Sequence, residues 1–371
     1  MINIVISGPN FTSGGPLSVL EDLLKTISKY KNFNITALVH SKKLFNDKTY
    51  GGIAFIEFPD SKSSWKNRIN YEYREFYILS KKLKPDIWLS MHDITPNVET
   101  KFLATYCHNP SPFYKLKLKD FLYDKKFALF NLFYKYLYGI NIRKNDYIFV
   151  QQNWIKNEFE KMFSISNVIV AKPDIDINII KNTKDVQQEM TTFFYPSFPR
   201  VFKNFEVICQ AVQYLETKQN LKNFKVYLTI DGSEEKYSKD IVTKFKHLDS
   251  IEFIGLLSRD NVFNYYNQSD VLIFPSKLET WGLPISEFKA YEKPMLVSDL
   301  AYAKETVGNY EKVNFFPPEN YKTLAKLMEM HINGKTKFDG NSYNNQIDLI
   351  GWDKFIEFIE NKYEEKSKDY N

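Results

Sequence analysis

The sequence alternates short apolar runs with amphipathic stretches, and this alternation occurs twice along the chain. In the first half, a run rich in β-branched residues (2–7) precedes a stretch with helical spacing (16–30). The same order resumes at residue 191 and continues to residue 332. Strands that alternate with helices form parallel sheets covered by helices. We therefore predict two α/β domains in series.

The length of 371 residues is also consistent with two domains. We place an N-terminal domain at residues 1–172 and an interdomain linker at residues 173–190, within a polar stretch that starts at Val168. A C-terminal domain is expected at residues 191–350, and an amphipathic helix at residues 351–371. No apolar run approaches the roughly 20 residues that a spanning helix needs, and the N-terminus reads as a first strand and not as a signal peptide.

The two cysteines indicate the compartment. Cys107 and Cys209 show neither a disulfide framework nor metal-ligand spacing. A reducing compartment fits this usage best. We therefore expect a cytoplasmic protein.

Positive charge is concentrated in one segment. Residues 101–145 contain nine Lys/Arg and two Asp, which more than accounts for the net charge of +5. Within them, the basic-aromatic segment (residues 113–144) interleaves lysines with Phe and Tyr. Such a helix can lie on an anionic membrane, or it can simply have an aromatic core face and a solvated lysine face. No nucleic-acid module accompanies it, so we expect no nucleic acid as partner.

A strand-to-helix junction at residues 275–288 carries two glutamates, Glu279 and Glu287, eight positions apart. Gly282 allows close backbone approach and Pro284 fits a first helical turn. A helix start with exposed N–H groups attracts anions, and flanking carboxylates accept hydrogen bonds from hydroxyls, which together suit a nucleotide-sugar. The alternative is that Glu287 only complements the helix dipole and Glu279 is a solvated loop residue.

The sequence around this junction resembles a known family signature. "PSKLETWGLPISEFKAYEKPMLVSD" resembles the E-x7-E motif of retaining glycosyltransferases of family 4, the group 1 glycosyl transferases. "FFYPSFPRVFKNFEVICQAV" and "SGGPLSVLEDLL" resemble that family's phosphate-binding lysine segment and first glycine loop, and "GWDKFIEFIENKY" its last helix. The resemblance implies the GT-B fold: two Rossmann-like α/β domains whose parallel sheets face a cleft, with a C-terminal helix that crosses back to the first domain.

The resemblance also assigns donor-binding roles. It implies that Glu287 binds the ribose hydroxyls and Glu279 the hydroxyls of the donor sugar. Backbone N–H groups around Trp281, Gly282 and Leu283 would hold the donor's sugar and diphosphate. Lys203 would neutralise the diphosphate; the alternative is an ordinary surface lysine. Arg200 would assist, although the family often has an arginine five residues before the lysine, where this chain has Phe198.

The N-terminal domain contributes further candidates. His108 follows an apolar strand and, by resemblance, lies near the donor sugar; a capped structural histidine is the alternative. Gly14 and Gly15 could bring the first loop close to the donor phosphates or form a plain turn. His92 and Asp93 are expected to be acceptor-side or structural groups. The expected catalytic groups are thus His108, Lys203 and Glu279.

A D-x-D triplet, Asp174 and Asp176, falls in the predicted linker. In another glycosyltransferase fold such a triplet holds a metal, but here it lacks the strand-end setting, and we interpret it as a chance occurrence. We therefore predict no metal and no cofactor, with a UDP- or GDP-sugar as substrate.

The predicted function is transfer of a hexose-type sugar, with retention, from a nucleotide-sugar to a glycan or lipid-linked glycan acceptor in cell-surface polysaccharide synthesis. A lipid-linked acceptor would suit peripheral membrane association at the inner face of the cell membrane. Two alternatives stay open: a nucleotide-sugar epimerase on the same fold, and a non-catalytic nucleotide-sugar-binding subunit.

Overall fold

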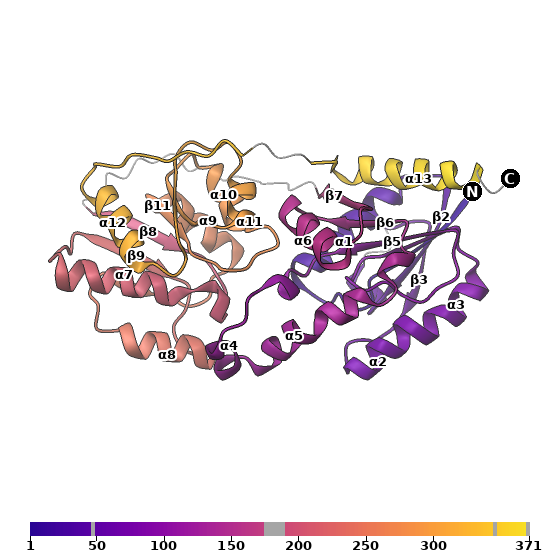
Figure 1. Cartoon of the computed structure of the whole chain (residues 1–371), viewed down its shortest axis with the longest axis horizontal. Coiled ribbons are helices and arrows are strands. Elements are labelled where there is room, and N and C mark those ends of the chain that lie inside the picture. The colour runs from indigo at the N-terminus through magenta and orange to yellow at the C-terminus, as the bar shows by residue number, and fades with distance from the viewer. Residues whose placement is uncertain (46–48, 174–189, 344–346, 369–371) are drawn as a thin grey trace. The chain divides into compact units, whose positions relative to one another are not determined.

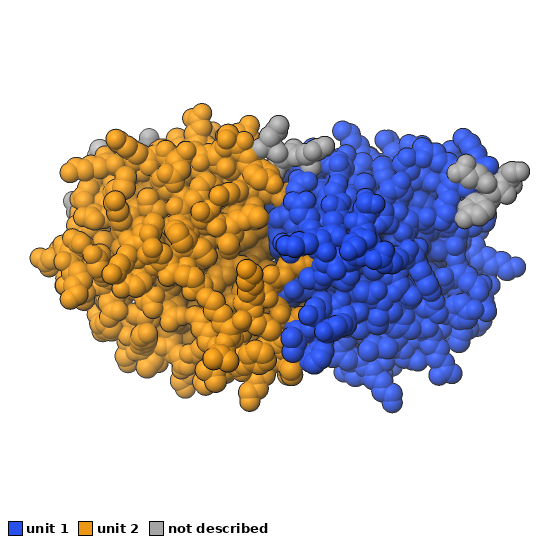
Figure 2. All heavy atoms as spheres, viewed as in Figure 1, with its two compact units in different colours: residues 1–112, 132–175, 346–371 blue, residues 113–131, 176–345 orange. Residues whose placement is uncertain are grey.

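The protein, described by a computed structural model over residues 1–45, 49–173, 190–343 and 347–368, divides into two compact units. Unit 1 comprises residues 1–112, 132–175 and 346–371, and unit 2 comprises residues 113–131 and 176–345 (Figure 2). Each unit is built around its own parallel sheet (Figure 1). The predicted pair of α/β domains is confirmed.

Unit 1 has an eight-stranded sheet among its described residues, in the order β14-β7-β6-β5-β4-β1-β2-β3. Neighbouring strands pair in parallel throughout. The strands are β1 (Ile2–Ser7), β2 (Phe33–Val39), β3 (Ile53–Glu57), β4 (Ile87–Ser90), β5 (Phe102–Cys107), β6 (Tyr147–Val150), β7 (Val168–Lys172) and β14 (Leu349–Ile350). The helices are α1 (Gly14–Ile27), α2 (Trp65–Asn70), α3 (Phe76–Leu83), α6 (Asn153–Phe163) and α13 (Trp352–Lys368), with a π-helical turn η2 (Tyr71–Glu75) between α2 and α3.

The core of unit 1 includes the end of the chain. Trp352, Phe355 and Ile356 of α13 are buried in one cluster with β1, β4 and α1. The hydroxyl of Tyr30 donates to Asp353 Oδ1 at 2.8 Å, and Lys366 pairs with Asp146 at 2.5 Å. The predicted return of the C-terminal helix to the first domain is confirmed.

Unit 2 has a six-stranded parallel sheet among its described residues, in the order β10-β9-β8-β11-β12-β13. The strands are β8 (Thr191–Tyr195), β9 (Phe224–Leu228), β10 (Ile251–Phe253), β11 (Val271–Phe274), β12 (Met295–Ser298) and β13 (Val313–Phe316). The helices are α4 (Leu118–Tyr123), α7 (Phe205–Lys218), α8 (Lys236–Phe245), α9 (Arg259–Gln268), α10 (Leu283–Lys289), α11 (Ala301–Val307) and α12 (Tyr321–Ile332). Helix α5 (Lys125–Gly139) begins in unit 2 and ends in unit 1.

Three details differ from the sequence-based expectation. Val168–Lys172, the start of the stretch interpreted as polar, is strand β7 of the first sheet, because its buried valines pair with β6. The apolar run at residues 251–257 has the pattern of a strand, but β10 covers only Ile251–Phe253. Leu349 and Ile350, expected in the second domain, form β14 beside β7 in the first sheet.

Residues 113–131 also depart from the predicted domain boundaries, which assigned them to the N-terminal domain. They pack with unit 2 through aromatic contacts of Tyr114 and Phe127 with Phe202. Two ion pairs accompany these contacts: Lys119 with Glu206 at 2.8 Å, and Lys117 with Glu319 at 2.6 Å. The predicted linker lies almost entirely outside the described residues, as do Asp174 and Asp176.

Candidate functional site

The junction after β11 has the local structure that its sequence predicts. Strand β11 ends at Phe274, and α10 starts at Leu283 with Pro284 in its first turn. Gly282 at the N-cap has φ 79°, in the left-handed region that favours glycine. A Cβ added there would lie 3.3–3.4 Å from Ile285, Phe274 and Tyr302. Glycine therefore allows the loop to lie directly against the core at this point.

Glu287 is held inside unit 2 by two donors. Its side chain is on the first turns of α10, and the residue is only 6% exposed. The hydroxyl of Tyr266 on α9 donates to Glu287 Oε2 at 2.9 Å, and Arg259 Nη2 lies 3.3 Å from Oε1. Burial raises the pKa of Glu287, while the Tyr266 hydrogen bond and the Arg259 charge oppose that rise.

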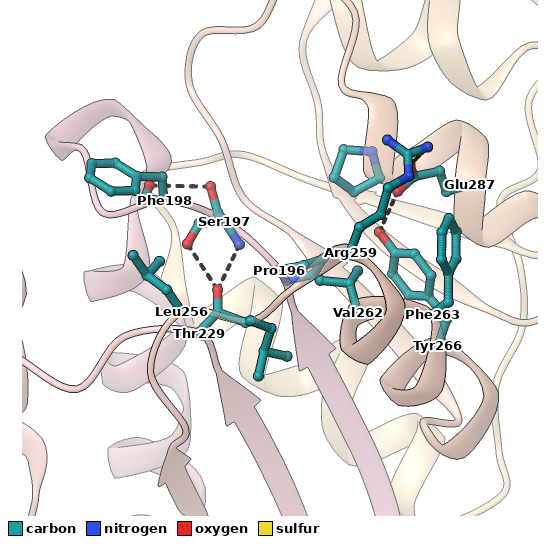
Figure 3. A pocket seen from close by; sticks show the side chains of 12 residues that line it. Pro196, Ser197, Phe198, Thr229, Leu256, Arg259, Val262, Phe263, Tyr266 and Glu287 are labelled. Carbon is teal, nitrogen blue, oxygen red and sulfur yellow. Dashed lines mark hydrogen bonds and ion pairs between the residues drawn. The ribbon is translucent and has the colours of Figure 1, made fainter. Parts of the chain in front are cut away.

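Glu287 lies at one end of a cavity of about 400 Å³ (Figure 3). The cavity is at the carboxyl ends of β8 and β9, the edge at which open α/β sheets bind ligands. At its other side, Ser197 N donates to Thr229 Oγ1 at 2.8 Å, and Thr229 Oγ1 lies 2.9 Å from Ser197 O. The remaining lining residues are Pro196, Phe198, Leu256, Leu257, Arg259, Val262, Phe263, Tyr266 and Pro284. An apolar cavity with one carboxylate suits a flat ring joined to a hydroxyl-bearing group.

Lys203 and Glu279 are brought together by the fold. Lys203 Nζ is 2.5 Å from Glu279 Oε1, although the two residues are 76 positions apart. Asn204, with φ 62°, follows Lys203, and its side chain donates to Pro275 O at 3.1 Å and Pro318 O at 2.7 Å. These bonds fix the turn before α7 against the end of β11. Lys203 is therefore a partly buried, paired lysine and not a free surface residue.

Arg200 is engaged elsewhere in unit 2. Its guanidinium pairs with Asp124 at 2.8 Å and with Glu235 at 3.4 Å. Asp124 lies between α4 and α5, in the basic-aromatic segment. Arg200 is therefore paired with two carboxylates, and a diphosphate would have to compete with them for the guanidinium group.

Trp281 is fixed in the loop that precedes α10. Its indole N–H donates to Ser286 Oγ at 2.8 Å, and Thr306 Oγ1 donates to the Trp281 carbonyl. Leu283 is the first residue of α10. The 279–287 loop is thereby tied to both α10 and α11.

His108 lies in unit 1, directly after β5. Its backbone N–H donates to Asp93 Oδ1 at 2.6 Å, and its Nδ1 is 3.3 Å from Gln151 Nε2. The ring packs on Tyr106 and meets the edge of Phe11. Burial lowers the pKa of His108, and the neighbouring Asp93 charge opposes that shift. The imidazole is thus favoured as a neutral group.

Gly14 and Gly15 form the start of α1 and are exposed. Gly14 has φ 73°, and a Cβ at either glycine would meet nothing within 4 Å. Open space above these backbone atoms leaves them accessible to a ligand.

His92 and Asp93 are scaffold groups in unit 1. Asp93 has φ 77° and accepts hydrogen bonds from Asn109 N at 3.1 Å as well as from His108. It also accepts from the hydroxyls of Tyr134 and Tyr138, both at 3.2 Å. His92 is buried, with Nε2 at 3.0 Å from Glu72 Oε1.

Several site residues are not evident from the sequence. Tyr266 and Arg259 lie on α9, 21 and 28 positions from Glu287, and no local pattern connects them to it. The signal that could have found the cavity is the pair of strand ends after β8 and β9, since such ends line the binding edge of a parallel sheet. No group of three or more His, Cys, Asp or Glu in the described ranges could hold a metal ion.

The sequence profile of the family "Glycosyl transferases group 1" matches residues 176–346, which contain Lys203, Glu279, Glu287 and the whole cavity. This part of the chain, slightly less than half of it, is therefore similar to the group 1 glycosyltransferases. A curated relative of the chain is "Uncharacterized glycosyltransferase 335" of Sulfolobus islandicus rod-shaped virus 1, which is 24% identical over 206 residues. That alignment covers 50% of the chain and 60% of the relative's length.

Solved glycosyltransferases share the fold of this chain. The lipopolysaccharide outer core galactosyltransferase WaaB has a TM-score of 0.60 at 14% identity, with 100% of this chain and 98% of that one covered. Anabaena Alr3699/HepE, solved in complex with UDP-glucose, has a TM-score of 0.59 at 14% identity, with 90% of each chain covered. The predicted GT-B fold is confirmed.

Proposed function

We propose that this chain transfers a hexose-type sugar from a nucleotide-sugar donor to a glycan or lipid-linked glycan, with retention of the anomeric configuration. The observation that carries the proposal is the arrangement in unit 2 of the Glu287 cavity and the Lys203–Glu279 pair, all within the family match. We also propose that the chain is a member of glycosyltransferase family 4.

The cavity residues suit the nucleoside of such a donor. The base would lie among the apolar side chains, and Glu287 would accept hydrogen bonds from the ribose hydroxyls. A carboxylate held in place by Tyr266 is pre-organised for this role, because it does not need to be ordered when the ribose arrives. The HepE structure contains UDP-glucose, which supports a uridine or guanosine diphosphate sugar as the donor class.

Lys203, Glu279 and His108 would act at the reacting end of the donor. Lys203 would stabilise the charge that develops on the leaving diphosphate, and Glu279 would accept hydrogen bonds from the sugar hydroxyls. Glu279 is paired with Lys203, so donor binding would exchange that contact for contacts with diphosphate and sugar. His108 would donate to, or orient, a hydroxyl at the reacting centre. Backbone N–H groups at Trp281, Gly282 and Leu283, and the loop at Gly14 and Gly15, would complete the donor site.

The proposed reaction is a front-face displacement. The bond between the anomeric carbon and the phosphate oxygen breaks, and the bond to the acceptor oxygen forms on the same face. The acceptor's proton passes to the departing phosphate oxygen, so the protein supplies positioning and charge stabilisation. We propose that no metal ion and no cofactor are needed.

The basic-aromatic segment suits a membrane-bound acceptor at the cytoplasmic face of a membrane. Leu118 is 86% exposed and Leu122 is 69% exposed on α4, and Leu129, Phe133 and Tyr136 are exposed on α5. The exposed lysines Lys115, Lys125 and Lys126 accompany them, and each lysine near an anionic surface contributes about 1 kcal/mol. Lys117 and Lys119 are paired within unit 2, so they are not expected to contribute. None of the described helices is long and apolar enough to cross a membrane.

Vesicle binding tests this surface. Vesicles containing phosphatidylglycerol should sediment the wild-type chain, and vesicles of phosphatidylcholine alone should not. Leu118→Ser combined with Leu122→Ser should reduce sedimentation severalfold, because it removes exposed apolar area without touching the core. Lys222→Ala, a change at an exposed lysine paired with Asp249, is the matched control. Equal sedimentation of all three proteins would contradict the membrane proposal.

The donor is tested by a thermal-shift screen of UDP- and GDP-sugars, followed by product analysis. One base should raise the melting temperature, and addition of a glycan acceptor should release the nucleoside diphosphate and yield an elongated glycan. A rearranged nucleotide-sugar formed without acceptor would indicate an epimerase. Donor binding without turnover would indicate a non-catalytic subunit.

A further inference from the structure

A series of aromatic contacts in unit 2 ends at the ammonium group of Lys203. This group lies over the ring of Phe202, with Lys203 Nζ 5.7 Å from the ring centroid. The same ring contacts the rings of Phe127 and Tyr114, at centroid distances of 5.1 Å and 6.2 Å. Because Lys203 Nζ also lies 2.5 Å from Glu279 Oε1, the ammonium is bounded by an aromatic ring and by a carboxylate.

Phe202 and Lys203 belong to the 3₁₀ turn η5 (Val201–Lys203), whose backbone is tied to two strand ends. The hydroxyl of Tyr195, the last residue of β8, donates to Lys203 O at 2.7 Å. The backbone N–H of Lys277, which follows β11, donates to Phe202 O at 2.7 Å. These bonds hold the main chain, but a lysine carries its charge on a flexible four-carbon stem. The position of the ammonium therefore depends on its side-chain neighbours.

The aromatic neighbours of this turn come from a distant part of the sequence. Residues 113–131 pack with unit 2, whereas the residues on both sides of this segment belong to unit 1 (Figure 2). Phe127 lies on α5 of the segment, and Tyr114, which is only 8% exposed, precedes α4. Asp124 of the same segment pairs with Arg200, the N-cap residue of η5, at 2.8 Å. The segment thus contacts the turn at its N-cap and at the residue before the lysine.

We propose that Phe202 is a positioning residue for Lys203, through which residues 113–131 act on the donor site. The rings of Tyr114 and Phe127 hold the Phe202 ring in place, and that ring attracts the ammonium and restricts its positions. A side chain that is already ordered costs less free energy to immobilise when an anion binds. The consequence for catalysis rests on the proposed function, in which this ammonium meets the leaving diphosphate.

Chemical labelling of lysines tests the positioning role without any donor. The full chain is treated with limiting acetic anhydride, and mass spectrometry gives the acetylation rate at Lys203, whose side chain is 19% exposed, and at Lys222, whose side chain is 58% exposed. Phe202→Leu keeps an apolar side chain but removes the aromatic face, so it should raise the rate at Lys203 severalfold and leave Lys222 unchanged. Phe202→Ala should raise it further. An unchanged rate at Lys203, or an equal rise at both lysines, would overturn the proposal whether or not the chain is a transferase.

Two variants in the segment test whether it acts through Phe202. Phe127→Leu removes the ring that packs on Phe202 and should raise the Lys203 labelling rate as Phe202→Leu does. Tyr123→Leu is the matched control, because the Tyr123 ring contacts Tyr237 of α8, at a centroid distance of 5.4 Å. An equal rise in Tyr123→Leu would show that general docking of the segment controls the lysine, and it would contradict the proposal.

Calorimetry tests the consequence for the donor site. UDP carries the diphosphate that Lys203 would meet, and uridine lacks it; GDP and guanosine replace them if the guanine nucleotide binds. Phe202→Leu should raise the Kd for UDP about twofold to about tenfold, the cost of ordering one long side chain, and should leave the Kd for uridine unchanged.

A double mutant separates positioning from a general structural effect. In a Lys203→Ala background, Phe202→Leu should have no further effect on the Kd for UDP, because the group that it positions is absent. A further loss there, or an equal loss for uridine in the single variant, would overturn the positioning role. If the wild-type chain binds neither nucleotide, the proposed function is wrong, and the labelling rates still decide whether Phe202 positions Lys203.

Discussion

Replacement of Glu287 should weaken nucleotide binding by an amount that its contacts define. A carboxylate offers about four lone-pair positions, and Tyr266 and Arg259 use two of them. Two positions are left, enough for the two hydroxyls of a ribose. A hydrogen bond to a charged group contributes about 1.5–3 kcal/mol, and about 1.4 kcal/mol corresponds to a tenfold change in Kd. Loss of even one such bond in Glu287→Ala should therefore raise the Kd for the nucleoside diphosphate by about tenfold to about 150-fold.

Isothermal titration calorimetry measures this effect, and two variants separate its causes. Glu287→Gln keeps one acceptor oxygen with two lone pairs, one for Tyr266 and one for ribose, so its Kd should lie between those of wild type and Glu287→Ala. Tyr266→Phe keeps the carboxylate but removes a hydrogen-bond donor that lowers the pKa of Glu287. Its loss of nucleotide affinity should therefore be smaller than that of Glu287→Ala, and it should grow as pH falls and Glu287 becomes protonated. Thermal unfolding must be followed in parallel, because Glu287→Ala leaves the buried Tyr266 hydroxyl without its acceptor.

Deoxynucleotides make the assignment specific. In the wild-type chain, the 2′-deoxy or 3′-deoxy form of the nucleoside diphosphate should bind more weakly than the ribose form. In Glu287→Ala that difference should nearly vanish, since the partner of the hydroxyl is already absent. An unchanged Kd in Glu287→Ala, or an unchanged deoxy effect, would refute the ribose-binding role.

The other predictions concern charge. Lys203→Ala should lower turnover by about 10²–10³-fold, the usual cost of removing one charge-stabilising group, with Lys222→Ala unaffected in the same assay. Turnover should survive excess EDTA, and loss that a divalent ion restores would contradict metal independence. Burial alone would raise the pKa of Glu319, but hydrogen bonds with Lys117 and Lys277 and the charges of these lysines outweigh it and lower the pKa to about 2. A lowered carboxyl pKa stabilises the fold above the unfolded value of 4.5 and loses that effect as pH falls toward 2. Glu319→Gln should therefore reduce the unfolding free energy at pH 7 more than at pH 2, as measured by urea denaturation; equal reductions would contradict this.

The parts of the site that the sequence predicts are those with local causes. A β-branched run ending in Pro-Ser, a glycine that needs φ 79° and a proline in a first helical turn together fix the junction between β11 and α10. The position of Glu287 then follows from its place in the first turns of that helix. The resemblance predicts the return of α13 to unit 1, and the apolar face of this helix supports it.

The parts that the sequence does not predict depend on contacts between distant segments. Arg200 meets Asp124, 76 positions earlier, because residues 113–131 pack on unit 2. The interleaved lysines predict one continuous solvent-facing or membrane-facing surface, yet Lys117 and Lys119 form ion pairs within unit 2. In the sequence, Glu72 looks like an ordinary charged helical residue. In the structure it lies in a π-helical turn and is buried beside His92.

Transfer of sugar from a defined donor tests the central claim most directly. The purified chain should be incubated with the nucleotide-sugar identified by thermal shift and with lipid-linked or free glycan acceptors, and both the released nucleoside diphosphate and the anomeric configuration of the new linkage should be measured. We predict release that depends on the acceptor, a product with the donor's anomeric configuration, and loss of both in Lys203→Ala but not in Lys222→Ala. An inverted product, or release that Lys203→Ala leaves unchanged, would contradict the proposed donor site and mechanism.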